Sequence, residues 1–122
     1  ADCIATDHAP HTQEDKAAGS PGFTGLETAF ATCNTVLVKK EGFSLNRLSE
    51  LMSDNPAKLL KIESGRFLAG YNADFVLVDA NEEWVVNPKS FYSKGKSTPL
   101  EGQKLTGKVH ATFFGGKLVF GR

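Results

Sequence analysis

The hydrophobic pattern changes its period near Gly65, and this change constrains the fold more than any other feature. Before it, apolar side chains recur at steps of four, three and four, at Leu26, Phe30, Cys33 and Leu37. This spacing lines one face of a helix. After Gly65, glycines separate short runs such as 73–79 and 83–86, which are typical of strands. The sequence therefore predicts a helical half followed by a β half.

Helix-start signals divide the first half into three predicted helices. Thr24 and Glu27 have the spacing of a capping box, in which each side chain bonds the other's backbone amide. Ser44 can cap a second helix. Asn55 followed by Pro56 predicts the start of a third, with the asparagine as N-cap and the proline in the first turn.

The second half contains a hairpin signal at Gly115 and Gly116. These glycines separate the runs 108–114 and 117–120 and favour a tight turn between two strands. Together with the two earlier runs, they predict a small sheet of at least four strands. A polar loop, 92–99, lies between the predicted strands.

Charge and composition narrow the partners. The 14 basic and 14 acidic side chains balance, so nothing favours nucleic acid or an anionic membrane as a partner. No apolar run approaches the ~20 residues that span a bilayer, and the first residues do not resemble a secretory signal. Cys3 and Cys33 are too few for a disulfide framework. We therefore expect reduced thiols and a cytoplasmic protein, with a Cys3–Cys33 bridge as the weaker alternative.

The segment ATDHAPHT, residues 5–12, is the main candidate site. It follows a short apolar run that predicts the end of a buried strand, where α/β folds place functional side chains. Pro10 disfavours a helix here. In a loop, Asp7 can ligate a divalent metal and act as a general base, and His11 can donate to an anionic substrate. A string this short also occurs by chance. We interpret the distant His110 as a sheet-surface residue.

Several strings in order resemble the C-terminal third of the dihydroorotase family, in its bacterial branch. They are Ala5–Thr12, Gly25–Phe30, Asn55–Lys58, Gly70 with Ala73-Asp74, Ser93-Lys94, Thr98-Pro99 and Gly102. Each later string is weak alone, whereas the ordered set spans nearly the whole chain and is specific.

The resemblance implies a zinc-dependent cyclic amidohydrolase that interconverts N-carbamoyl-L-aspartate and L-dihydroorotate in pyrimidine biosynthesis. Asp7 matches a zinc ligand of the family that also exchanges the proton of the attacking hydroxide. His11 matches the histidine that binds the substrate carboxylate, and Pro21 and Gly22 match a loop whose backbone meets the substrate. His8 has no role in this comparison, and we expect it to brace the loop by a hydrogen bond.

The implied parent fold is α/β, a TIM barrel with a small β module. Within it, this chain is expected to be an α+β fragment. Residues 1–64 would supply the last barrel strand, the active-site loop and helices, and residues 65–122 the C-terminal, mostly antiparallel strands of the β module. The family's other zinc ligands find no match here, so we expect the isolated chain to be inactive. We also expect a homo-oligomer or a self-associating fragment.

Three alternatives remain open. Allantoinases and hydantoinases share the barrel and the β module, although the A-P-H-T and G-L-E-T strings favour dihydroorotase. The parent can also be an inactive dihydroorotase-like subunit that scaffolds a transcarbamoylase. A β-rich binding module without enzymatic activity is the third, and it leaves the ordered strings unexplained.

Overall fold

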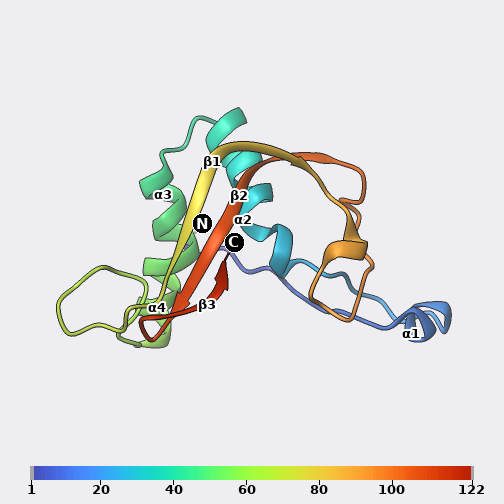
Figure 1. Ribbon diagram of the computed structural model, residues 1–122, viewed down its shortest axis with the longest axis horizontal. Coiled ribbons are helices and arrows are strands. Elements are labelled where there is room, and N and C mark those ends of the chain that lie inside the picture. The colour runs from blue at the N-terminus through green and yellow to red at the C-terminus, as the bar shows by residue number, and fades with distance from the viewer. Residues whose placement is uncertain (1, 122) are drawn as a thin grey trace.

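The computed structural model describes residues 2–121 and places a three-stranded antiparallel sheet in front of a layer of helices (Figure 1). The helical elements are α1 (Gln13–Ala17), η1 (Leu26–Thr28), α2 (Ala29–Cys33), η2 (Asn34–Lys40), α3 (Leu45–Ser49), η3 (Glu50–Asp54), α4 (Asn55–Leu60) and η4 (Pro88–Ser90). The strands are β1 (Phe75–Val85), β2 (Lys104–Phe114) and β3 (Lys117–Gly121), in the order β1-β2-β3. None of the helices in this part of the chain has the length and apolarity needed to cross a membrane.

The first predicted helix forms, but it begins differently from the prediction. The elements η1, α2 and η2 run on from Gly25, which caps them without a side-chain hydrogen bond. The predicted capping box is wrong, because Thr24 and Glu27 both bond a distant loop instead. Gly42, with φ of 75°, follows the helix end, where a residue without Cβ adopts this conformation at little cost.

The second and third predicted helices are one continuous helix. Ser44 caps it as predicted, its hydroxyl accepting from the Arg47 amide at 3.1 Å. Asn55 is not an N-cap, since its backbone is helical and its amide donates to the Glu50 carbonyl five residues back. This wider π-type turn precedes Pro56, which has no N–H to contribute. The proline is thus absorbed within the helix instead of starting a new one.

The sheet has three strands in the described residues, not the four or more that were predicted. The hairpin across Gly115-Gly116 is confirmed. The runs 73–79 and 83–86 fall in one strand, β1, whose register against β2 shifts between Asp79 and Glu83. The Asp79 carboxylate accepts from the amides of Asn81 and Glu82, at 2.8 and 3.1 Å, and so folds the extra residues into a bulge. These bonds hold the pKa of Asp79 below its usual value.

The core joins the two halves of the sequence. Its buried apolar side chains are Ala31, Val86, Phe91 and Leu105, with Trp84 and Leu100 packed against them. Beside them Asn34 is fully buried, and its Nδ2 donates to the carbonyls of Ala80 and Thr106 at 3.0 and 2.8 Å. The helical layer is therefore tied to the bulge of the sheet. The division at residues 64 and 65 stays a prediction.

The expected barrel strand before the candidate site is not formed as a strand within residues 2–121. Residues 3–5 have no regular secondary structure and are attached by the Ile4 amide to the Leu51 carbonyl at 2.9 Å. A parallel strand needs hydrogen-bonded neighbours, and nothing in the described chain takes that place. The barrel remains a prediction. Cys3 and Cys33 are both free thiols, so the alternative of a bridge between them is wrong.

Candidate active site

Asp7 occupies a sharp corner of the backbone. Its φ of 47° lies in the left-handed region, which few residues other than glycine adopt. The side chain is exposed, and no hydrogen bond or ion pair joins its carboxylate to another residue in 2–121. Backbone strain of this kind concentrates at functional sites. The carboxylate of Asp7 is therefore free to bind a ligand.

His8 braces this corner, as predicted. Its Nδ1 accepts from the amides of Gly25 and Leu26 at 3.1 and 3.2 Å. These amides begin η1, where the first N–H groups have no partner within the helix. An accepting Nδ1 assigns the ring proton of the neutral imidazole to Nε2. The next residue pairs with the same segment, because the Ala9 amide donates to the Phe23 carbonyl at 3.0 Å.

His11 and Gly22 come together, although they lie on different segments. A Cβ added at Gly22 would lie 2.7 Å from the Ala9 carbonyl oxygen and 3.4 Å from Cδ2 of His11. Gly22 also has a φ of 105°, so both space and backbone require glycine. Pro21 is its exposed neighbour. No hydrogen bond links the side chains of Asp7 and His11 in the described chain.

A short helix separates His11 from Gly22. The helix α1 projects at one end of the molecule (Figure 1). Thr12 and Asp15 form a capping box at its start, and this hydrogen bonding by Thr12 holds the pKa of Asp15 below its usual value. Lys16 donates to the carbonyls of Ser20 and Gly22, at 2.8 and 3.1 Å. These bonds connect the helix to the chain that returns to Gly22. The T-x-x-D spacing of Thr12 and Asp15 is a signal for the start of this helix, and the sequence analysis missed it.

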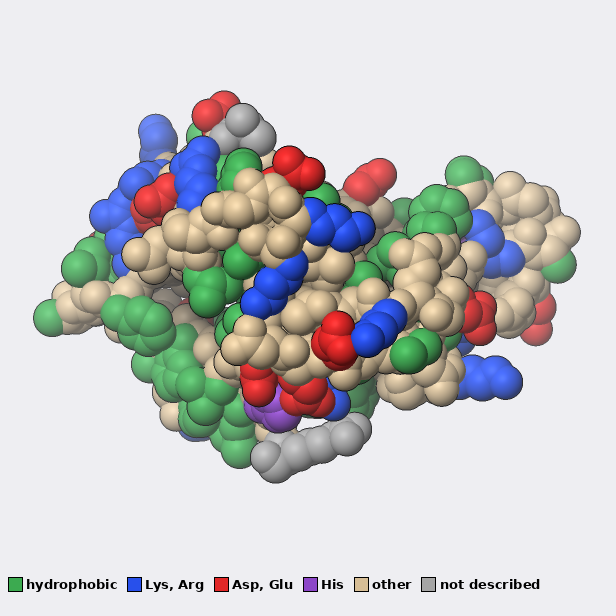
Figure 2. Space-filling view, turned by 90° about the horizontal axis from the view of Figure 1, so that it is seen from above, with side chains coloured by type: hydrophobic (Ala, Val, Ile, Leu, Met, Phe, Trp, Pro, Cys, Tyr) green, Lys and Arg blue, Asp and Glu red, His purple; other side chains and the backbone are tan. Residues whose placement is uncertain are grey.

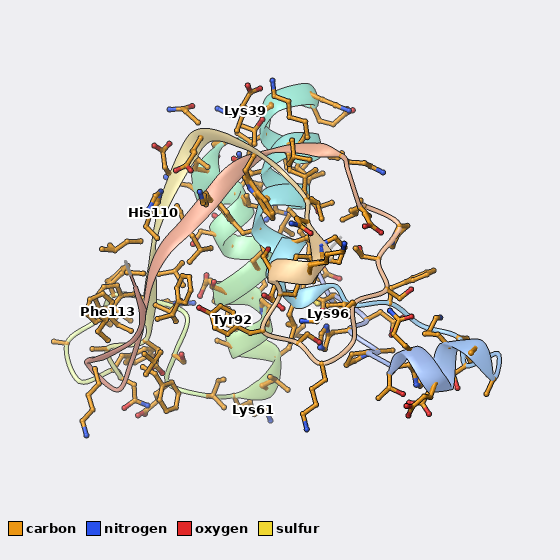
Figure 3. The ribbon with its side chains drawn as sticks, turned by 45° about the vertical axis from the view of Figure 1, so that its right-hand side comes forward. Lys39, Lys61, Tyr92, Lys96, His110 and Phe113 are labelled. Atoms are coloured by element: carbon orange, nitrogen blue, oxygen red, sulfur yellow. The ribbon has the colours of Figure 1, made fainter. Side chains whose placement is uncertain are left out.

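A loop from the β half lies against the segment of the candidate site. The sequence did not predict this placement. We call residues 91–98 the clamp loop; Tyr92 and Lys96, labelled in Figure 3, belong to it. The Thr24 hydroxyl donates to the Gly95 carbonyl at 2.9 Å. The carboxylate of Glu27 accepts from the amides that begin the loop. The sequence predicted a polar loop at 92–99, but not its contact with the segment of the candidate site.

His110 lies away from the candidate site, on the opposite side of the molecule (Figure 3). It is half-exposed on β2, with Nε2 2.7 Å from a carboxylate oxygen of Glu82. Lys108 bonds the other oxygen, and these partners hold the pKa of Glu82 below its usual value. The interpretation of His110 as a sheet-surface residue is confirmed.

The described residues do not provide a complete metal site. Within 2–121, no three histidine, cysteine, aspartate or glutamate side chains come close enough to hold an ion. The Asp7 carboxylate is a hard oxygen donor without a protein partner, which fits a zinc ligand. Nδ1 of His8 is engaged. Burial raises the pKa of the Cys33 thiol and keeps it protonated, so it is a poor ligand.

Comparisons with known proteins agree on one family. The model of the amidohydrolase family matches residues 2–119. The dihydroorotase of Clostridium botulinum (strain Eklund 17B / Type B) is 52% identical over 119 residues, which cover 98% of this chain and 30% of that protein. The dihydroorotase of Thermoanaerobacter sp. (strain X514) is 46% identical over 123 residues, covering 98% and 28%. The resemblance to dihydroorotases is therefore confirmed, and the chain spans about 30% of these relatives.

Solved structures show the same fold. The L-hydantoinase (dihydropyrimidinase) from Arthrobacter aurescens superposes with a TM-score of 0.89 at 32% identity, over 98% of this chain and 29% of that one. A dihydropyrimidinase from Brevibacillus agri NCHU1002 has a TM-score of 0.91 at 23% identity, covering 98% and 28%. The second likeness concerns the fold alone.

Proposed function

Because the chain belongs to the amidohydrolase family, we propose that it forms one wall of the active site of a zinc-dependent dihydroorotase. Such an enzyme reversibly cyclises N-carbamoyl-L-aspartate to L-dihydroorotate in pyrimidine biosynthesis. The observation that carries the proposal is the unpaired carboxylate of Asp7, held at a left-handed corner that His8 braces. A rigid, unpartnered carboxylate is what metal ligation and proton transfer both require.

Each candidate residue has a distinct role in the proposed reaction. In ring opening, Asp7 takes a proton from the attacking water and delivers it to the leaving ring nitrogen. In ring closure it takes a proton from the attacking ureido nitrogen and delivers it to the departing hydroxyl, so one carboxylate serves both directions. His11 donates a hydrogen bond to the substrate carboxylate, and Pro21 and Gly22 offer backbone groups to the substrate. The close packing of Gly22 against Ala9 supports this, because it brings that backbone beside His11.

Zinc would be held in part by Asp7, with further ligands from outside the described residues. A catalytic zinc usually has three protein ligands and one open position. When bound, it polarises the scissile carbonyl and lowers the pKa of water. In the family resemblance, Asp7 is the sole residue of this chain that matches a zinc ligand, so we propose that the chain is inactive without the remaining ligands. The free thiols fit the proposed cytoplasmic location.

A hydantoinase or allantoinase activity is the second candidate. It is favoured by the likeness to the hydantoinase structure at 32% identity. These enzymes also open cyclic amides, so Asp7 would keep its role. The difference would lie at His11, because hydantoin lacks the carboxylate that this residue is proposed to bind.

A chimeric enzyme tests the proposal. The segment of the Clostridium botulinum dihydroorotase that this chain matches is replaced by this chain, and turnover of L-dihydroorotate, hydantoin and allantoin is measured. We expect turnover of L-dihydroorotate, its loss in the Asp7→Asn chimera, and no turnover by the 122-residue chain alone. A folded, zinc-loaded chimera that opens only hydantoin or allantoin would overturn the first candidate in favour of the second.

A further inference from the structure

We propose that the clamp loop sets the position of His11, with Glu27 and Gly95 as the positioning residues. The inference rests on the proposed function only where it gives His11 a substrate to bind. The position itself is a property of this chain and can be measured without any activity. The contacts that support it run in three steps, from Glu27 through the loop to the backbone of His11.

Glu27 holds the beginning of the clamp loop. One carboxylate oxygen accepts from the Tyr92 amide at 2.8 Å and the other from the Ser93 amide at 3.0 Å. A carboxylate that receives two successive amides makes charge-assisted hydrogen bonds, which are stronger than neutral ones. No lysine or arginine in residues 2–121 forms an ion pair with it. The hydrogen bonds of the Glu27 carboxylate are therefore made to this loop.

Thr24 holds the middle and the end of the loop. It is 2% exposed, its hydroxyl donates to the Gly95 carbonyl at 2.9 Å, and its amide donates to the Ser97 carbonyl at 2.8 Å. Lys96 donates to the Phe91 carbonyl and closes the loop on itself. Hydrogen bonds thus attach the beginning, the middle and the end of the loop to the segment 24–27.

Gly95 packs closely against the backbone of His11. A Cβ placed there would lie 2.7 Å from Cβ of Pro10 and 3.0 Å from both the amide nitrogen and the carbonyl oxygen of His11. The atoms that would collide are mainly backbone atoms, which cannot rotate away as the end of a side chain can. Glycine is needed here for the close approach. On its other side, the His11 ring faces Gly22, so the residue is held between two loops.

The direct test measures His11 in the 122-residue chain by ¹⁵N NMR and amide exchange. In Glu27→Gln, the neutral amide side chain offers only one acceptor, and we expect exchange at Tyr92 and Ser93 to rise about tenfold. The amide and imidazole signals of His11 should shift with it. The control Glu101→Gln changes an exposed carboxylate without a hydrogen bond in the described residues and should change neither. Faster exchange at Tyr92 and Ser93 with unmoved His11 signals would overturn the proposal, as would unchanged exchange.

A second pair of variants keeps the test decisive if Glu27→Gln fails to fold. Gly95→Ala should shift the amide and imidazole signals of His11. Gly121→Ala, whose methyl meets only the flexible Leu118 side chain, should leave them in place. Unmoved His11 signals in a folded Gly95→Ala chain would show that the loop does not position this residue.

Kinetics of the chimera separate positioning from simple loss of folding. A misplaced His11 should raise KM for L-dihydroorotate several-fold more than it lowers kcat, since the lost contact is one of binding. A smaller fraction of folded enzyme lowers kcat and leaves KM unchanged, and that result would count against positioning. If the unmutated chimera turns over no dihydroorotate, the proposed function fails, while the NMR result still decides the position of His11.

Discussion

The imidazole Nδ1 of His8 and the backbone amide of Gly25 lie 3.1 Å apart and form a hydrogen bond between segments 17 residues apart in the chain. The Leu26 amide donates to the same nitrogen at 3.2 Å. One side chain thus serves as the N-cap of η1 from outside the helix, where the preceding threonine is engaged elsewhere. These two hydrogen bonds also fix the position of His8, which directly follows Asp7.

The first prediction follows from this bond. His8→Ala leaves the amides of Gly25 and Leu26 without their acceptor and should lower the free energy of unfolding by about 1 kcal/mol, as loss of an N-cap does. His8→Asn places an amide oxygen near the position of Nδ1 and should recover most of that loss. Urea unfolding of the three chains measures this. Equal stability of the alanine and parent chains would contradict the brace.

Asp7→Asn separates function from folding. Asparagine adopts the left-handed conformation as readily as aspartate, so we expect unchanged stability in urea. It is a poor zinc ligand and no base, so turnover by the chimera should fall by about 100- to 10,000-fold. Zinc content, measured by elemental analysis after dialysis, should fall as well. Near-normal turnover would remove Asp7 from its proposed role.

Asn34 should matter for stability more than any exposed asparagine. Asn34→Ala removes the donor to the carbonyls of Ala80 and Thr106 and leaves them without this partner. The Thr106 carbonyl still accepts from the Thr35 hydroxyl at 3.3 Å, so the main cost falls on the Ala80 carbonyl. An acceptor left without its partner costs about 1–3 kcal/mol, and we expect a loss of that size in urea unfolding. Asn46→Ala, at an exposed position, is the control. Similar losses in both variants would show that the buried bonds contribute little.

Local signals in the sequence predicted those parts of the fold that depend on neighbouring residues. The cap at Ser44 and the hairpin at Gly115 were found because their partners lie within a few residues. Thr24 and Glu27 had the spacing of a capping box, but their partners lie 71 and 65 residues away. Tertiary contacts overrode the local signal, as they often do.

The candidate site was predictable on one side only. The segment that carries Asp7 and His11 contains the candidate side chains in a short string. The clamp loop contributes backbone groups and the absence of a side chain at Gly95, and neither leaves a chemical signature in a sequence. A bulge that continues a strand past Asp79 was likewise invisible, because it depends on two backbone amides finding one carboxylate.

Low pH should lower the free energy of unfolding of the chain, in part through protonation of Asp54. Hydrogen bonds from Lys58 and Arg66 hold the pKa of this carboxyl below its usual value. A lowered folded-state pKa adds stability above the unfolded-state pKa of about 3.9, and that stability is lost as the pH falls through the folded-state value. Asp54→Asn should therefore flatten the fall of unfolding free energy below about pH 4. Glu101→Gln is the control, and equal slopes in both variants would contradict the assignment.

The last prediction concerns self-association of the chain. Hydrophobic side chains gather along the sheet side of the molecule (Figure 2). Val76 and Leu77 on β1 are about half exposed, and Leu118 and Val119 on β3 are 59% and 61% exposed. Neighbouring residues of a strand point to opposite faces, so both faces carry apolar surface. Since β1 and β3 are also the two edges of the sheet, their free backbone groups can pair with another chain.

We therefore expect concentration-dependent dimers or larger species of the isolated chain in light scattering. Val119→Lys places a charge on the β3 edge, a change that opposes edge-to-edge pairing, and should shift the population toward monomer. Val36→Lys puts the same charge at an exposed apolar position on the helix η2 and not on a strand edge, and should leave association unchanged. If the sheet is the contact, only the first variant dissociates. A parent chain that stays monomeric at high concentration, or an equal effect of both lysines, would contradict association through the sheet.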